Sequence, residues 1–189
     1  TTFLLEALTD APNGALLPPQ QMKAWEEKRN AVNRYYKSIG YDDINVCQKT
    51  YCEGPYGRDA IFLRHGANSN RLTTNSTARL LCDIVRGKAV TAARSKKMME
   101  LLHRDMNTKS DGPDDQRHGF TAMILPKDAQ LWSKSGWTGT NRHDAAYVEM
   151  PDGTKAILVI FTTGHGYQRN ILPAISDKLL KGLHDIKTK

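Results

Sequence analysis

The chain has 189 residues, of which 39% are hydrophobic and 25% are charged, as is ordinary for a globular protein. No run approaches the ~20 consecutive apolar residues of a membrane-spanning helix, so we expect no membrane span. The formal net charge is +7, but the basic residues are scattered among acidic ones and no stacking aromatics interleave with them. This pattern argues against a nucleic-acid-binding surface.

The first part of the chain has helical periodicity. Residues 1–8 are apolar and predict the end of a helix, which a turn follows. Pro18 and Pro19 then favour the start of a long helix that runs to about Ser38. The large residues that recur in it at helical spacing are predicted to be core residues: Met22, Trp25, Val32, Tyr35, Tyr36 and Ile39.

Residues 42–71 are polar and contain several glycines, without a clear period. They predict a long loop, and such a loop in a compact domain is usually functional or disordered. Cys47 and Cys52 are close enough in it to form a disulfide in an extracytoplasmic protein, or else both stay reduced. Cys82 falls in a helical pattern and is predicted to be buried. The histidines show no metal-ligand spacing, so no metal site is expected.

Two further helices are predicted before the period changes. Thr73 or Thr74 can cap a helix over residues 75–86. Thr91 can cap another helix, which runs from residue 92 to about residue 106. A charged segment with proline and glycine follows, and it separates this helical part of the chain from the part beyond it.

From residue 120 the period changes towards two. Three antiparallel strands are predicted over residues 129–136, 143–150 and 155–163. Pro151, Asp152 and Gly153 predict a tight turn between the last two strands. A final helix over residues 170–187 should pack across the sheet. The apolar residues predicted for its inner face are Ile171, Ala174, Ile175, Leu179, Leu180 and Leu183.

These elements predict an α/β (α+β) protein with two parts. Residues 1–115 form a portion of a helical subdomain that includes the long loop 42–71. Residues 116–189 form an antiparallel sheet backed by the C-terminal helix. We therefore look for chemistry where a strand meets a turn in the second part.

The first predicted strand carries a Lys-Ser-Gly triplet. Strand alternation sends Lys134 and Gly136 to one face and Ser135 to the other. Gly136 has no side chain, so a ligand can approach the backbone closely, and the next amide, on Trp137, is free to donate to an oxyanion. A cation, a hydroxyl and an amide in this order suit a carboxylate-bearing acyl substrate.

The triplet also matches a known signature, because Lys-Thr/Ser-Gly is the third motif of serine beta-lactamases and penicillin-binding proteins. The segments around it follow in the matching order: Ile124-Leu125-Pro126, Lys134-Ser135-Gly136, Met150-Pro151-Asp152-Gly153 and Phe161-Thr162-Thr163-Gly164. In this order the C-terminal part resembles class A beta-lactamases. Upstream, residues 72–87 are similar to the helix entry that follows that family's omega loop. The resemblance covers most of the chain.

Two motifs of that family are missing. The nucleophile lies in Ser-x-x-Lys, and no serine of this chain is followed by lysine three residues later. There is no Ser-x-Asn either, although residues 1–8 look like the helix that begins just after it. The resemblance therefore implies a C-terminal part of a longer protein, with the N-terminal part of the fold missing.

The resemblance assigns roles to the first strand. A serine supplied by the missing part would be acylated and deacylated. Lys134 would tune the charge of the pocket, and Ser135 would hold the substrate carboxylate. The backbone amide of Trp137 would complete the oxyanion hole, and Gly136 and Thr138 would border the substrate.

The family's other functional groups match less well. A basic residue nine positions after the triplet lysine often anchors the substrate carboxylate; His143 occupies that position and Arg142 is adjacent. Alternation lets only one of them face inward. The family's omega loop carries Glu-x-x-x-Asn for deacylation, and the predicted loop over residues 42–71 lacks this spacing, because Glu53 is followed four residues later by Gly57. Glu53 and Asp59 are the carboxylates available for that role.

The function implied by the resemblance is that of a serine hydrolase acting on beta-lactams or related carboxylate-bearing amides, without a cofactor. The expected partners are the small-molecule or peptide substrate and the missing N-terminal part, in the periplasm or outside the cell. One alternative is a D-alanyl-D-alanine peptidase or penicillin-binding protein, which uses the same triplet. Another is a non-catalytic binding module that kept the fold.

Overall fold

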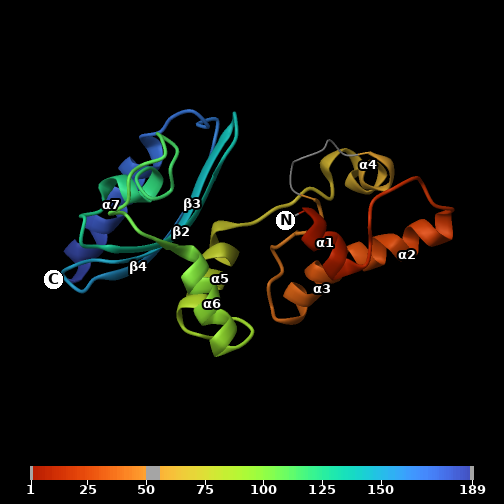
Figure 1. Cartoon of the computed structure of the whole chain (residues 1–189), viewed down its shortest axis with the longest axis horizontal. Helices are drawn as coiled ribbons and strands as arrows, with labels where there is room; N and C mark the ends of the chain where they lie inside the picture. Colours follow the sequence, from red (N-terminus) through yellow and green to blue (C-terminus); the bar gives the residue numbers. More distant parts are fainter. Residues whose placement is uncertain (1, 50–55, 188–189) are drawn as a thin grey trace. The chain divides into compact units, whose positions relative to one another are not determined.

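The computed structural model describes residues 2–49 and 56–187. Contacts divide the chain into two compact units, Thr1–Ser76 and Thr77–Lys189, which we describe separately (Figure 1). This boundary lies upstream of the predicted division after residue 115, which separates helical from strand-rich sequence and stays a prediction. No helix of the described residues is long and apolar enough to cross a membrane.

The first unit is built from short helices. They are α1 (Thr2–Thr9), α2 (Pro19–Arg29), α3 (Ala31–Ser38), α4 (Gly57–Leu63) and the 3-10 turn η1 (Arg64–Gly66). The single long helix predicted up to Ser38 is wrong, because the chain breaks at Asn30 between α2 and α3. The Asn30 side chain donates to the carbonyl of Glu26 at 3.0 Å, and such local bonds compete with helix continuation. After the break Tyr35 and Ile39 are exposed rather than core residues.

The predicted loop over residues 42–71 contains a helix, α4, so the loop prediction is wrong there. Seven residues are too few to display a helical period or to be stable alone, so tertiary contacts decide. Phe62 of α4 is buried and meets the Trp25 ring edge-on, with ring centroids 5.5 Å apart. The core of this unit therefore combines Trp25 of α2 and Phe62 of α4 with Ala11 and Cys47 from the connecting segments.

A buried ion cluster accompanies this core. The Arg29 side chain is fully buried and lies 3.0 Å from the Asp59 carboxylate. Lys49 approaches Asp59 at 3.7 Å and Glu6 at 3.0 Å. The cluster thus ties α1, α2 and α4 to one another.

The second unit contains an antiparallel sheet of four strands in the order β1-β2-β3-β4. Its elements are α5 (Thr74–Val85), α6 (Ala92–Leu102), β1 (His103–Arg104), η2 (Phe120–Ile124), β2 (Gln130–Trp137), β3 (Asn141–Glu149), β4 (Lys155–Thr163) and α7 (Ile171–Lys187). The three predicted strands, the final helix and the α+β fold class are confirmed. The helix predicted to residue 106 ends earlier, because His103 and Arg104 pair with β2.

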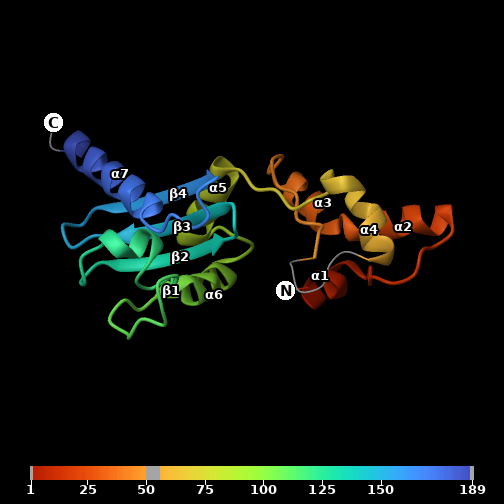
Figure 2. The same cartoon turned by 90° about the horizontal axis from the view of Figure 1, so that it is seen from above.

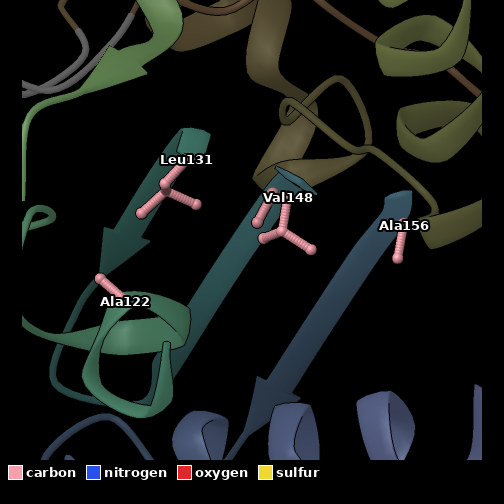
Figure 3. Packing of buried hydrophobic residues seen from close by; sticks show 5 residues of the cluster. Ala122, Leu131, Val148 and Ala156 are labelled. Carbon is pink, nitrogen blue, oxygen red and sulfur yellow. The ribbon is translucent and has the colours of Figure 1, made fainter. Parts of the chain in front are cut away.

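One face of the sheet forms the main core. Leu131, Val148 and Ala156 from three neighbouring strands pack with Ala122 of η2 (Figure 3). Ala146 completes this cluster, and Leu180 of α7 packs against it. Figure 2 shows the strands side by side with α7 crossing them.

The inner face of α7 is narrower than predicted. Leu172 is fully buried against Ile160 and Phe120, with Ile175 beside them. Leu179 and Leu183, which were expected on the same face, are exposed. Helical spacing alone could not show which apolar residues of α7 are buried, because that depends on where η2 and the sheet contact the helix.

Candidate active site

The predicted alternation of β2 is present in the structure. Ser133 and Ser135 are buried at 1% and 7% exposure, on the face that packs against η2 and α7. Lys134 and Gly136 lie on the opposite face and are exposed. An added Cβ on Gly136 would meet no atom within 4 Å, so the backbone here is open to close approach. The triplet therefore offers a ligand a cation and accessible backbone.

The edge of β2 that faces away from β3 carries the amide expected to bind an oxyanion. Thr138 donates its N–H to the Asn141 carbonyl at 2.8 Å, so even-numbered residues pair with β3. By antiparallel alternation, the backbone groups of Ser133, Ser135 and Trp137 point to the other edge. The Trp137 N–H thus lies on that edge, next to the open backbone of Gly136.

The Lys134 side chain is exposed as a whole, but neighbouring protein atoms partly desolvate its ammonium group. Its Nζ donates to the carbonyl of Ser135. Partial burial lowers the pKa of Lys134, the nearby positive charge of Arg104 lowers it further, and the negative charge of Asp144 acts in the opposite direction. Such a lysine favours an incoming anion, because a negative charge next to it relieves the cost of its desolvation.

The structure separates the two basic residues expected to anchor a carboxylate. Arg142 is 1% exposed on the buried face, where its guanidinium binds Asp114 at 2.8 Å and covers the Phe120 ring at 4.1 Å. It faces away from Lys134, so the structure does not bring these two side chains together. His143 lies on the Lys134 face, directly opposite Gly136 on the neighbouring strand. Its Nδ1 accepts the N–H of Thr162 at 3.2 Å.

Trp137 is the last residue of β2, and Thr138 begins the turn that follows it. Thr138 Oγ1 accepts the backbone N–H groups of Asn141 at 3.0 Å and Thr140 at 3.3 Å, so this hydroxyl shapes the hairpin turn. The Trp137 side chain is 47% exposed, and its ring centroid lies 6.5 Å from that of Tyr167. Whether Thr138 also contacts a substrate stays a prediction.

The candidate deacylating carboxylates belong to the first unit. Glu53 lies outside the described residues. Asp59 is buried beside Arg29 and Lys49, and burial raises the pKa of its carboxyl. Its present partners give it a structural role, and the catalytic role stays a prediction.

The cysteine predictions have mixed outcomes. Cys47 is a buried thiol whose Sγ lies 2.9 Å from Asn45 Oδ1, and burial raises its pKa. Cys52 lies outside the described residues, so the bridge between them stays a prediction. Cys82 is half-buried rather than buried.

Three residues near β2 were missed by sequence reasoning. Arg104 donates from Nη2 to the Ser133 carbonyl at 2.6 Å, and Gln116 accepts the Ser135 N–H at 3.1 Å. Asp144 faces Ser135 across the strand pair and is 2% exposed. Arg104 follows a helix and Gln116 lies in a charged loop, and neither context carries a pattern that points to the edge of a strand.

Asp144 gives a prediction for stability against pH. Its Oδ2 accepts the Thr121 N–H at 3.1 Å, and its buried Oδ1 has no hydrogen-bond partner among the residues that the structure describes. Burial raises the pKa of the carboxyl. A raised pKa means that the folded state holds the proton more tightly, so stability falls as pH rises from the unfolded pKa, about 4, through the folded one. Asp144→Asn should remove this loss. Melting temperatures of both proteins from pH 4 to 8 should diverge in favour of the variant, and parallel curves would contradict the assignment.

Comparisons with known proteins agree with this architecture. Residues 27–183 match the model of a family described as the beta-lactamase enzyme family. A beta-lactamase from Sphaerobacter thermophilus DSM 20745 aligns with a TM-score of 0.59 and 19% identity, over 81% of this chain and 52% of that one. A beta-lactamase from Chitinophaga pinensis DSM 2588 aligns with a TM-score of 0.61 and 16% identity, over 95% of this chain and 63% of that one. The structure of PBP-A aligns with a TM-score of 0.55 and 14% identity, over 82% of this chain and 51% of that one.

The structural likeness, at these low identities, concerns the fold. The chain spans between 51% and 63% of the lengths of these three structures. No match was found among curated proteins. The family model, in contrast, matches most of the sequence, including the whole β2 to β4 sheet and its Lys-Ser-Gly triplet. The chain therefore belongs to the beta-lactamase enzyme family.

Proposed function

We propose that the complete protein is a serine hydrolase that forms an acyl-enzyme with beta-lactams or related carboxylate-bearing amides. One observation carries the proposal: Lys134, the open backbone of Gly136 and the outward N–H of Trp137 follow one another along the edge of β2. Membership of the beta-lactamase enzyme family supports it. An extracytoplasmic location belongs to the same proposal.

In this proposal the nucleophile is a serine outside the 189 residues, because no serine of the chain lies in Ser-x-x-Lys. Its Oγ attacks the amide carbonyl carbon, a C–O bond forms, the C–N bond breaks, and the hydroxyl proton passes to the leaving nitrogen. The Trp137 N–H stabilises the negative charge that develops on the carbonyl oxygen. Lys134 attracts the substrate carboxylate from the exposed face of β2. The Ser135 side chain is buried on the opposite face, so its hydrogen bond to that carboxylate stays a prediction.

Deacylation is proposed to be slow. The loop over residues 42–71 lacks the Glu-x-x-x-Asn spacing, and the described candidate Asp59 is held by two cations. Each of its two oxygens faces a cation, Oδ1 Arg29 and Oδ2 Lys49, so neither is placed to take a proton from a water molecule. A mutant of the structurally similar PBP-A is described as an acyl-enzyme complex with penicillin G. This likeness supports a penicillin-binding protein as well as it supports a beta-lactamase.

Fluorescent penicillin tests the proposal directly. The complete protein is incubated with the probe, excess unlabelled penicillin is added, and the label is followed on denaturing gels. We expect one covalent label per molecule that is lost slowly, and no label on the 189-residue chain alone. Absence of label on the complete protein would contradict acyl-enzyme formation. Rapid turnover that is lost on Asp59→Asn would contradict slow deacylation.

A further inference from the structure

Two side chains form hydrogen bonds with the edge of β2 beyond the point where its neighbouring strand, β1, ends. β1 has two residues, and they pair only with Leu131 and Trp132. Beyond that point the Ser133 carbonyl accepts from Arg104 Nη2 at 2.6 Å. The Ser135 N–H donates to Gln116 Oε1 at 3.1 Å. An edge strand with unpaired groups can pair with any extended ligand, and these two contacts remove that possibility over Ser133 and Ser135.

The loop that carries Gln116 is tied down on both sides of it. Asp115 Oδ2 accepts the Asp111 N–H at 3.0 Å and binds the Arg117 guanidinium at 2.9 Å. The hydrogen bond from Arg117 is the largest of the interactions that hold the pKa of Asp115 well below its usual range. Asp114 joins the buried Arg142 at 2.8 Å. Gln116 thus reaches the strand from a fixed backbone.

Arg104 is fixed as well. Its Nη1 donates to the carbonyls of Leu101 at 3.3 Å and His103 at 3.2 Å, while Nη2 serves Ser133. The guanidinium is half-buried, and its charge lies close enough to that of Lys134 to lower the lysine pKa. Arg104 and Gln116 therefore contact β2 directly before and directly after Lys134.

We propose that Arg104 and Gln116 are positioning residues that close the edge of β2 over Ser133 and Ser135, so that a substrate can pair with the strand only from Trp137 onward. The proposal rests on the proposed function. A substrate bound to a closed edge has one register, with its reacting carbonyl at the Trp137 N–H. Without the two contacts the substrate can slide along the strand, and misplacement by about 1 Å can cost ~10²-fold in rate.

Isosteric substitutions at Gln116 separate positioning from packing. Gln116→Leu keeps the shape and loses the acceptor, whereas Gln116→Glu keeps an acceptor for the Ser135 N–H. In the complete protein we expect the rate of penicillin acylation to fall about 10- to 100-fold in the leucine variant. In the glutamate variant we expect the rate to stay within a factor of about three of that of the parent. Gln130→Leu, the same exchange at the exposed far end of β2, is the control and should leave the rate unchanged.

Arg104 supplies the second pair. Arg104→Met removes the donor to Ser133, and Arg104→Lys can keep one bond. We expect the methionine variant to lose rate and the lysine variant to regain most of it. Because Arg104 also lowers the pKa of Lys134, the methionine variant should shift the pH profile of acylation to higher pH. Equal rates in both variants, at equal melting temperatures, would overturn the proposal.

Amide hydrogen exchange tests the closure of the β2 edge independently of whether the protein forms an acyl-enzyme. Amide exchange of the β2 peptide in the complete protein should be faster in Gln116→Leu than in the parent and normal in Gln116→Glu. If the parent is not acylated at all, the proposed function fails, and the exchange data still decide whether the edge is closed. If the parent is acylated and Gln116→Leu has unchanged exchange and rate, the positioning role is overturned and the function stands.

Discussion

Replacing Lys134 with alanine in the complete protein is expected to slow acylation by penicillin roughly 10²- to 10³-fold. The Lys134 ammonium is partly desolvated, and it lies two residues before the open backbone of Gly136 on β2. Removing it takes away one electrostatic contact that is stronger in a partly dry site than in water. Acylation rates of parent and variant, measured with a fluorescent penicillin, give the ratio.

Lys155→Ala is the matched control for that experiment. Lys155 is a lysine of the same sheet whose side chain is 60% exposed and pairs with Glu149 at 2.9 Å. Surface ion pairs of this kind contribute ~0–1 kcal/mol, so the control should acylate normally. The acylation rate of Ser135→Ala should lie between those of Lys134→Ala and Lys155→Ala. We expect a loss of ~1 kcal/mol of transition-state stabilisation, or somewhat more, as for a hydrogen bond to a charged acceptor. A well-folded Lys134→Ala protein with a normal rate would remove β2 from the active site.

Arg142→Met is expected to lower the free energy of unfolding by about 3 kcal/mol, at the low end of the range for breaking a buried ion pair. The arginine side chain is 1% exposed, binds Asp114 and covers the Phe120 ring. The loss is limited because Asp114 keeps its second partner, Arg169, at 2.9 Å. Urea unfolding of parent and variant measures the difference.

Arg169→Met provides the comparison for this second result. Arg169 binds the same Asp114 carboxylate from a side chain that is 49% exposed. We expect it to cost less than ~1 kcal/mol, as exposed ion pairs do. Equal destabilisation by the two variants would show that burial is not what makes Arg142 important.

The C-terminal sheet could be predicted from the sequence because its signals are local. Apolar residues crowd β4 from Ala156 to Phe161, and the Pro151-Asp152-Gly153 turn forms its hydrogen bond from the Gly153 N–H to the Met150 carbonyl at 2.9 Å. The helical unit was harder. α4 owes its position to the contact between Phe62 and Trp25, and Asn30 breaks a helix through a side-chain bond that periodicity does not reveal.

The candidate site could be predicted along the strand but not across it. Strand alternation placed Lys134 and Ser135 on opposite faces, and it also showed that Arg142 and His143 could not both face inward. Which of the two faces Lys134 depends on the register between β2 and β3, and that register sets His143 opposite Gly136. Arg104 and Gln116 reach β2 from segments 29 and 19 residues away in sequence, and no local pattern encodes such contacts.

The measurement that tests the account most directly is peptide mapping of the complete protein after reaction with benzylpenicillin. Mass spectrometry identifies which serine carries the penicilloyl group. We predict a single modified serine in a Ser-x-x-Lys motif outside the 189 residues, and we expect Lys134→Ala to slow its modification. A modified serine within the chain, such as Ser133 or Ser135 of β2, would contradict the assignment of this strand as a binding edge. A protein that stays unmodified would contradict the acyl-enzyme mechanism itself.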